Sequence, residues 1–305
     1  MKTRKEIPGA PVAGDAAAFL MRAVEGRWHR LAAEVERNRR RCTEPGIHDL
    51  RVATRRLLAV LDLADSVLPG EVNPRTRRVL RRNLKAFSPL RDCHVRILTL
   101  RGLMRRYTVA RPLLRESRLL ERELVGNAAR LITRFDPAAF EREVSAIVLA
   151  LASLEDTPAR ASAAVSVLVG VAAKKYIRVS ARAMKLSAGN TKTIHRLRVA
   201  FKEYRYTMEA LQPLFPGVGK ARLKTMNAFQ TSMGEIQDIE VLIGVVGKFA
   251  VRRGAAYPAS VLNLQRHLAA RRLSLVNAFM KNSDAVSQFW PCGSSPVRPT
   301  ASLQP

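Results

Sequence analysis

The sequence predicts an all-α protein built from two related helical bundles. Apolar residues recur at helical spacing along most of the 305-residue chain, whereas the alternating pattern of β-strands is nearly absent. Several segments begin with a polar residue and a proline, a pair that suits the first turn of a helix. A short motif from the first half of the chain also recurs in the second half.

Four polar residues are placed to cap helices, because each precedes a proline whose missing N–H has no partner in the first turn. These residues are Thr43, Asn73, Asp136 and Thr157. The predicted helices span residues 15–41, 45–66, 74–107, 111–134, 137–154, 158–187, 192–212, 218–252 and 258–281, with breaks expected around Pro89 and Gly234. We expect disordered tails over residues 1–14 and over the Pro- and Ser-rich residues 282–305.

The internal repeat predicts a duplicated bundle. The segment 47–53 recurs at 194–200 with six of seven residues identical, and the segment 90–95 is answered by 236–241. The lag between the copies is nearly constant and close to half the chain. We therefore expect a first helical bundle over residues 15–134 and a second over 135–281, related by a pseudo-twofold axis.

The charge balance points to a polyanionic partner. Lys and Arg total 53 against 25 Asp and Glu, a formal net charge of +28, which repels itself unless a partner neutralises it. Aromatic residues make up only 6%, which disfavours a protein that stacks the bases of single-stranded nucleic acid. No run of about 18 apolar residues occurs, so no membrane insertion is expected. Three cysteines without a CxxC pair indicate reduced thiols and a cytoplasmic location.

Basic residues form stripes on several predicted helices. At about 100° per residue, His48, Arg51 and Arg55 share one face, opposite an apolar one. A second helix aligns His195, Arg198, Lys202 and Arg205, and a third aligns Arg78, Arg81, Arg82 and Lys85. A solvated face is one interpretation of each stripe, but solvated faces usually mix charges, since like charges at i,i+4 repel. The whole set favours a bound anion, and the planar arginine fork suits phosphate oxygens.

The histidines and aspartates near the repeated motifs leave alternatives open. His48 and His195 are either ordinary polar residues or donors to phosphate, and neither has a metal-ligand partner one turn away, so no metal site is expected. Asp92 and Asp238 are either helix caps or carboxylates that hold an arginine in place.

The repeated His-x-x-Arg-Val-x-x-Arg/Lys pattern, followed by a leucine-rich helix and Arg/Gln-Asp-x-x-Val, resembles the CHAD family, the conserved histidine α-helical domain. The resemblance covers roughly residues 15–281. It implies two helical bundles related by a pseudo-twofold axis, with a basic cavity or channel between them. It also implies binding of inorganic polyphosphate and association with polyphosphate granules.

The resemblance implies a set of polyphosphate ligands. They are His48, Arg51, Arg55 and Arg56 in the first copy, His195, Arg198, Lys202 and Arg205 in the second, and Arg78, Arg82, Lys85 and, more weakly, Lys224 in the later helices. The chain departs from the family pattern at three positions. Leu58 replaces a basic residue, Glu203 answers Arg56, and Ser88 stands where glycine is usual.

The sequence favours binding without catalysis. It contains neither a phosphate-cradling GxxxxGK[ST] loop nor a GxSxG nucleophile turn, and it implies no cofactor. The closest string to the ExExK motif of the triphosphatases that accompany this family is Glu34-Val35-Glu36-Arg37, which lies in a predicted helix. A nucleic-acid-binding protein, and an adaptor that docks a granule or an acidic protein through the same basic surface, are the alternatives. The oligomeric state stays open.

Overall fold

The computed structural model describes residues 16–153, 158–215, 217–253 and 256–291. In these ranges the chain forms ten α-helices and no strand, so the all-α prediction is confirmed. The helices are α1 (Ala16–Arg40), α2 (Glu44–Val67), α3 (Pro74–Ala86), α4 (Ser88–Leu103), α5 (Ala110–Thr133), α6 (Pro137–Ala152), α7 (Pro158–Ala183), α8 (Thr191–Leu211), α9 (Lys220–Arg253) and α10 (Pro258–Lys281). Two 3₁₀ helices, η1 (Gln212–Leu214) and η3 (Ser283–Phe289), accompany them. No described helix is both long enough and apolar enough to cross a membrane.

Local capping fixes several helix starts as predicted. The side chains of Thr43, Asn73 and Asp136 each accept a hydrogen bond from a backbone N–H in the first turn of α2, α3 and α6. Each of these bonds satisfies one N–H that has no partner inside the helix. Thr157, the fourth predicted cap, lies outside the described residues.

One of the two predicted helix breaks is present and the other is absent. The chain leaves α3 at Phe87 and enters α4 at Ser88, next to Pro89, as expected. The break expected at Gly234 is wrong, because α9 continues through this residue without interruption. A glycine inside a helix costs only about 1 kcal/mol relative to alanine. The burial of Met233 and Ile236 on either side of Gly234 helps to keep α9 continuous.

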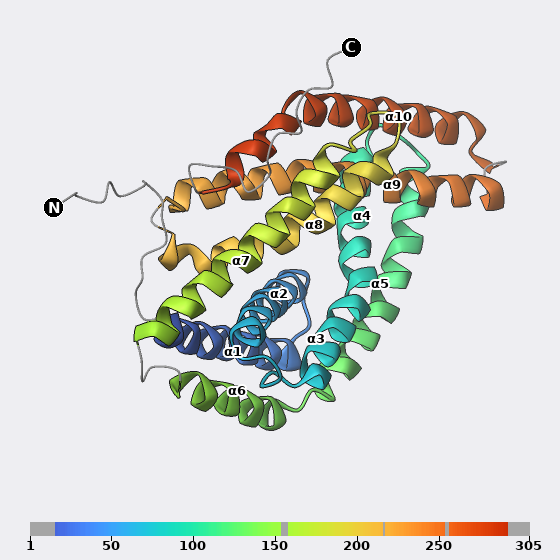
Figure 1. The fold of residues 1–305 in the computed structure, drawn as a ribbon. Helices are drawn as coiled ribbons and strands as arrows, with labels where there is room; N and C mark the ends of the chain where they lie inside the picture. Colours follow the sequence, from blue (N-terminus) through green and yellow to red (C-terminus); the bar gives the residue numbers. More distant parts are fainter. Residues whose placement is uncertain (1–15, 154–157, 216, 254–255, 292–305) are drawn as a thin grey trace, which may run out of the picture.

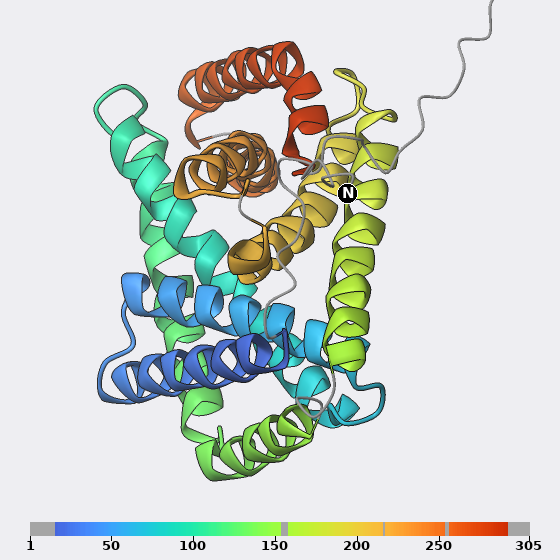
Figure 2. The ribbon, with the colours of Figure 1, turned by 60° about the vertical axis from the view of Figure 1, so that its left-hand side comes forward.

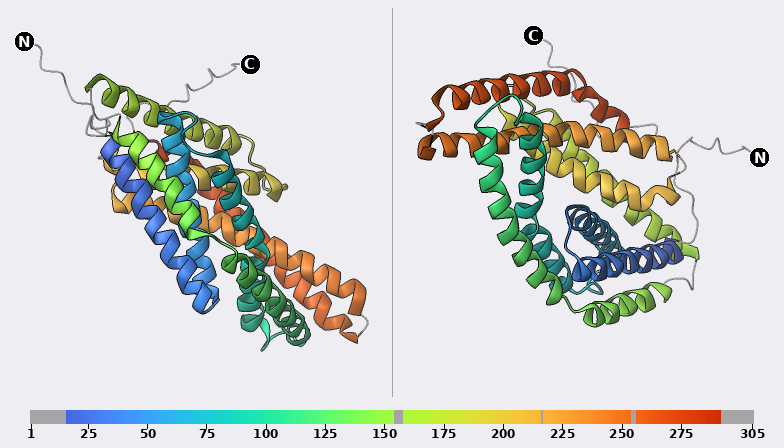
Figure 3. Two further views of the ribbon diagram at one scale, coloured as in Figure 1. Left: turned by 90° about the horizontal axis from the view of Figure 1, so that it is seen from below. Right: turned by 180° about the vertical axis from the view of Figure 1, so that it is seen from behind.

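The helices form two groups at opposite ends of the molecule, and other helices run between these groups (Figure 1). At one end α1 packs against α2 and α6, and at the other end α9 packs against α10. The α4–α5 pair runs between these ends, as the right-hand view of Figure 3 shows. Opposite this pair α7 packs against α8, and α8 contacts both α2 and α9 (Figure 2).

The larger hydrophobic core takes residues from both halves of the sequence. It includes Trp28 of α1, Leu57 of α2 and Tyr204 of α8, all of them fully buried. In α6, which the sequence assigned to the second bundle, Phe140 stacks on Trp28 of α1 with ring centroids 5.8 Å apart. A smaller core joins the C-terminal part of α4 and the N-terminal part of α5 to α9 and α10. The pseudo-twofold relation between the halves stays a prediction.

The C-terminal segment was wrongly predicted to be disordered from residue 282 onward. Residues 283–289 form η3, and the side chains of Phe289 and Trp290 are buried. The Tyr204 hydroxyl donates a 2.7 Å hydrogen bond to the carbonyl of Phe289, and Tyr176 stacks near Trp290. The burial of Phe289 and Trp290 stabilises this segment, although its local sequence gives little indication of a helix. The predicted tail over 1–14 and the residues after 291 lie outside the described ranges.

Candidate anion-binding cavity

A cavity of about 720 Å³ lies where α2, α4, α8 and α9 meet. The two basic stripes predicted for α2 and α8 face each other across it. Eight of the twelve predicted ligands line it: His48, Arg51, Arg55, Arg56, His195, Arg198, Lys202 and Arg205. The faces opposite the apolar stripes are therefore the walls of one cavity and not simply solvated surface.

Two cations in the cavity were missed by the sequence reasoning. Arg91 and Arg96 on α4 line the cavity beside the α2 residues. Arg91 lies in the repeated segment 90–95, which carried the alignment of the two copies and the family resemblance, so a signal for it was present. Polar uncharged groups complete the lining on α9, namely Asn227, Gln230, Thr231 and Gln237, and no charge pattern marked them.

Positive charge exceeds negative charge in this lining. Eight arginine and lysine side chains stand against three carboxylates, those of Asp92, Glu235 and Asp238. Burial makes this excess costly, because charges repel more strongly where water is scarce. Tyr206 is the single Phe, Tyr or Trp side chain among the residues that line the cavity.

The centre of the cavity holds cations without a carboxylate partner. Within the described residues, neither Arg55, Arg198 nor Lys202 forms an ion pair, and the buried ε nitrogens of the two arginines have no hydrogen-bond partner. The pKa of Lys202 is lowered from 10.5 to about 7, first by burial and then by the charges of Arg55, Arg198 and Arg51. Burial also lowers the pKa of Arg55. A bound anion would pair with these charges, for which the protein supplies no carboxylate among the described residues.

Gly234 brings the α9 backbone close to this cationic centre. A Cβ atom at position 234 would lie 3.5 Å from Nε of Arg198 and 3.7 Å from one of its terminal nitrogens. The Arg198 guanidinium therefore packs at van der Waals distance over the glycine. The residue expected to break α9 instead lies in a continuous helix next to a cation of the cavity.

A family model for the CHAD domain matches residues 22–246, well over half of the chain. The chain belongs to the CHAD family. Among solved structures, it is similar to the CHAD domain from the plant Ricinus communis, with 20% identity, a TM-score of 0.55 and coverage of 92% of this chain and 95% of the other. It is also similar to PptA from Streptomyces chartreusis, with 18% identity, a TM-score of 0.57 and coverage of 92% and 100%. At these identities the likeness shows a shared fold. A comparison with curated proteins found no match.

Arg51 of this CHAD domain is buried and hydrogen-bonded, although its position on the helical wheel predicted a side chain on the basic face. Its side chain is only 7% exposed and donates hydrogen bonds to the carbonyl of Leu84 at 2.9 Å and to Oγ of Ser88 at 3.1 Å. Burial, and then the charge of Arg55, lowers its pKa to about 10. Ser88, which departs from the glycine usual in the family, accepts one of these bonds. Arg51 thus links α2 to the α3–α4 junction while it lines the cavity.

Glu209 neutralises part of the cationic wall of the CHAD cavity. Its carboxylate lies 2.6 Å from Arg56 and 3.4 Å from Arg205, and Arg27 approaches it at 3.7 Å. Arg205 also donates to Oε1 of Gln230 at 2.9 Å. Arg56 and Arg205 are therefore held by the protein itself, unlike the central cations.

The histidines and aspartates in the CHAD cavity have distinct surroundings. The pKa of His48 is lowered, first by burial and then by the charge of Arg91. Asp92 and Asp238 lie inside α4 and α9, so the interpretation of these residues as helix caps is wrong. Burial raises the pKa of Asp238, while the charges of Arg91 and Arg198 oppose that shift. The nearby arginines agree with the alternative, a carboxylate that helps to position an arginine.

Four of the predicted ligands lie elsewhere on the CHAD domain. Arg78, Arg82 and Lys85 on α3 and Lys224 on α9 are exposed and do not line the cavity. Their assignment as ligands rested on the resemblance to the family and stays a prediction. The neighbouring Arg77 and Arg81 turn toward α2 and pair with Asp65 and Asp62.

Proposed function

We propose that the cavity binds inorganic polyphosphate and does not hydrolyse it. The observation that carries this proposal is the cluster of Arg55, Arg198 and Lys202, cations that converge on one cavity without an ion-pair partner among the described residues. Burying like charges together is unfavourable unless an anion joins them. A polyanion with closely spaced charges neutralises several of these cations at once.

The chemistry of the cavity supports polyphosphate over nucleic acid. A nucleic acid gains affinity by stacking its bases on aromatic rings. Tyr206 is the one Phe, Tyr or Trp side chain of the lining, and its ring centre already lies 4.2 Å from the guanidinium carbon of Arg205. Polyphosphate carries no bases and needs only donors and positive charge. Nucleic acid is then a weaker polyanion that competes for the same surface.

Binding without turnover agrees with the properties of Lys202. A pKa of about 7 leaves much of this amine neutral and potentially basic in the empty cavity. A bound polyanion raises that pKa, because it stabilises the charged ammonium form. Lys202 is then protonated when the ligand is present, and it donates hydrogen bonds instead of activating water.

The proposal is tested by competition at matched phosphate concentration. Labelled single-stranded DNA is bound to the protein, and unlabelled polyphosphate is added; the reverse experiment uses labelled polyphosphate. We expect polyphosphate to displace DNA far better than DNA displaces polyphosphate. Equal competition favours nucleic-acid binding, and no binding of polyphosphate refutes the proposal. Release of orthophosphate during the incubation refutes the non-catalytic part.

In cells we expect the protein at polyphosphate granules. This localisation follows from polyphosphate binding and is tested by imaging a fluorescent fusion together with a polyphosphate stain. A variant that lacks two of the three central cations, Arg198→Ala with Lys202→Ala, separates the two ways of reaching a granule. Loss of the granule signal in this variant means recruitment by polyphosphate, whereas its persistence favours an adaptor that docks on another component.

A further inference from the structure

A second cavity, of about 530 Å³, adjoins the first. It lies among α2, α3, α7 and α8, and three of its lining residues, Arg55, Lys202 and Tyr206, also line the first cavity. These side chains therefore form part of the wall of both cavities. An anion that reaches Arg55 and Lys202 from the first cavity is already at the border of the second.

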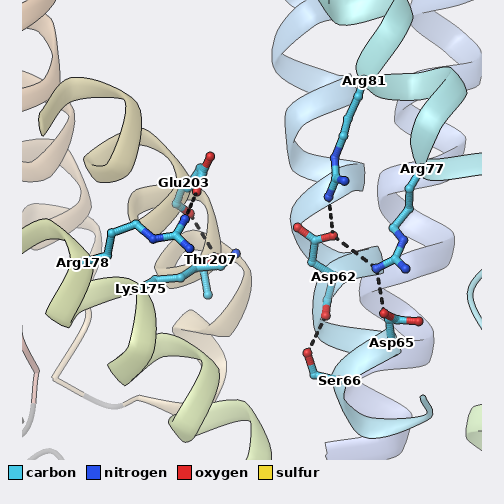
Figure 4. A network of polar contacts seen from close by, with 9 residues as sticks. All are labelled: Asp62, Asp65, Ser66, Arg77, Arg81, Lys175, Arg178, Glu203 and Thr207. Atoms are coloured by element: carbon cyan, nitrogen blue, oxygen red, sulfur yellow. Dashed lines mark hydrogen bonds and ion pairs between the residues drawn. The ribbon is translucent and has the colours of Figure 1, made fainter. Parts of the chain in front are cut away.

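The second cavity has cations of its own, but these cations are already bound by carboxylate or hydroxyl groups of the protein. Arg178 pairs with Glu203 at 3.2 Å, and Arg81 pairs with Asp62 at 3.1 Å (Figure 4). Lys175 donates a 2.8 Å hydrogen bond to Oγ1 of Thr207. In the first cavity, by contrast, Arg55, Arg198 and Lys202 form no ion pair among the described residues, although the Tyr206 hydroxyl is a hydrogen-bond partner of Arg55.

Asp62 is shared between two arginines. Its Oδ1 lies 3.1 Å from Arg81 and 3.7 Å from Arg77, and Arg77 also pairs with Asp65 at 2.7 Å (Figure 4). Loss of the Asp62 charge therefore frees Arg81 while Arg77 keeps a partner. Glu203 has one pairing partner, Arg178, in the described part of the chain, so its loss frees that arginine.

We infer that the second cavity binds the part of a long polyphosphate chain that extends beyond the first cavity. Asp62 and Glu203 weaken this binding, so they limit the preference of the protein for long chains over short ones. The inference rests on the proposed function. A phosphate group entering the second cavity has to displace Asp62 from Arg81 and Glu203 from Arg178, because each carboxylate occupies the donors that the phosphate needs. A short chain held by the first cavity does not meet this competition.

The test compares how one double substitution changes the affinity for a short and for a long polyphosphate chain. Affinity is measured by calorimetry for tripolyphosphate and for long-chain polyphosphate, with wild type and with the double variant Asp62→Asn, Glu203→Gln. We expect the double variant to bind the long chain about tenfold more tightly, the equivalent of one good contact, and tripolyphosphate almost as wild type does. The variant Lys175→Met, Arg178→Met is expected to weaken long-chain binding alone.

A matched control removes two carboxylates that line neither cavity. Glu116 pairs with Arg252 and Arg253 between α5 and α9, and Glu36 pairs with Arg39 and Arg40 on α1. Glu36→Gln with Glu116→Gln changes the net charge by the same amount, so it reports the general electrostatic effect. Equal gains for both ligand lengths, or a gain no larger than in this control, overturn the inference while polyphosphate binding stands. If wild type binds neither ligand, the proposed function fails together with the inference.

Discussion

Arg55 and Lys202 lie on facing helices at the border of the two cavities, and the charge of Arg55 is the largest single charge effect that lowers the pKa of Lys202. Neither side chain has an ion-pair partner among the described residues. The relationship makes Lys202 sensitive to whatever anion enters between the two helices. It also makes binding sensitive to pH.

The first prediction concerns proton uptake on binding. In the empty protein Lys202 titrates near pH 7, and a bound polyanion raises its pKa, so binding above pH 7 takes up a proton. We expect affinity for long-chain polyphosphate to fall by up to about tenfold per pH unit above 7, until the pH reaches the pKa of the complex. Calorimetry at pH 8 in buffers with different ionisation enthalpies measures the proton directly. The variant Lys202→Met is expected to lose this uptake, and an unchanged uptake contradicts the assignment.

The same lowered pKa predicts how the stability of the empty protein depends on pH. Between about pH 7 and 10.5 the unfolded chain holds a proton on Lys202 that the folded chain has released. The free energy of unfolding therefore gains a contribution that rises with pH across this window. Urea unfolding of wild type and Lys202→Met at several pH values isolates this contribution as the difference between the two. A difference that does not vary between pH 7 and 10 shows that Lys202 titrates normally.

The third prediction separates binding from folding. Among the described residues, Arg198 and Lys202 form no hydrogen bond or ion pair to another element, so Arg198→Ala with Lys202→Ala is expected to fold and to melt at the same or a slightly higher temperature. Each charge-assisted contact with phosphate is worth about 1.5–3 kcal/mol, so affinity is expected to fall at least about tenfold. Circular dichroism and calorimetry measure the two effects.

A control for this variant removes equal charge from another surface. Arg115 and Arg118 are exposed on α5 and line neither cavity. We expect Arg115→Ala with Arg118→Ala to bind nearly as wild type does. If the Arg198 and Lys202 variant folds and also binds normally, the anion does not lie in this cavity.

Helix formation and the facing basic stripes were predictable from local pattern, because caps and a period of 3.6 residues act within one helix. The stripe of α2 and the stripe of α8 both reached the cavity. Contacts between residues that are distant in the sequence could not be predicted from these local patterns. The bonds from Arg51 to Leu84 and Ser88 join residues 33 and 37 positions apart, and no local rule marks them.

Glycine shows the same limit in a different way. The identity of Gly234 suggested a helix break, since glycine weakens helices wherever it occurs. Whether that weakness bends the helix depends on what packs against it, and here Arg198 of another helix does. Likewise the α9 amides that face the cavity carry no charge, so only the packing of α9 against α8 shows that they belong to the site.

The fourth prediction follows from the buried position of Arg51. The substitution Arg51→Ala removes hydrogen bonds to the Leu84 carbonyl and to Ser88 at the α3–α4 junction. Ser88 Oγ keeps its own hydrogen bond to the Leu84 carbonyl, so this acceptor retains a donor. Each of the two lost hydrogen bonds contributes about 0.5–1.5 kcal/mol, so we expect the free energy of unfolding to fall by about 1–3 kcal/mol. Urea unfolding of Arg51→Ala beside Arg198→Ala checks the contrast, since Arg198 forms no comparable hydrogen bond within the described ranges. Equal stability of the two variants shows that the Arg51 bonds contribute nothing.

The last prediction uses Gly234 to test the cavity from the α9 side. A Cβ at this position meets Arg198 at 3.5 Å, an ordinary contact distance, and alanine favours a helix interior over glycine by about 1 kcal/mol. We therefore expect Gly234→Ala to raise the free energy of unfolding by up to about 1 kcal/mol and to keep polyphosphate affinity. Gly234→Leu fills the space of the Arg198 guanidinium, so it is expected to weaken binding severalfold while α9 stays helical. Chemical denaturation and calorimetry on both variants measure these effects, and normal binding by Gly234→Leu excludes a role for Arg198 at this position.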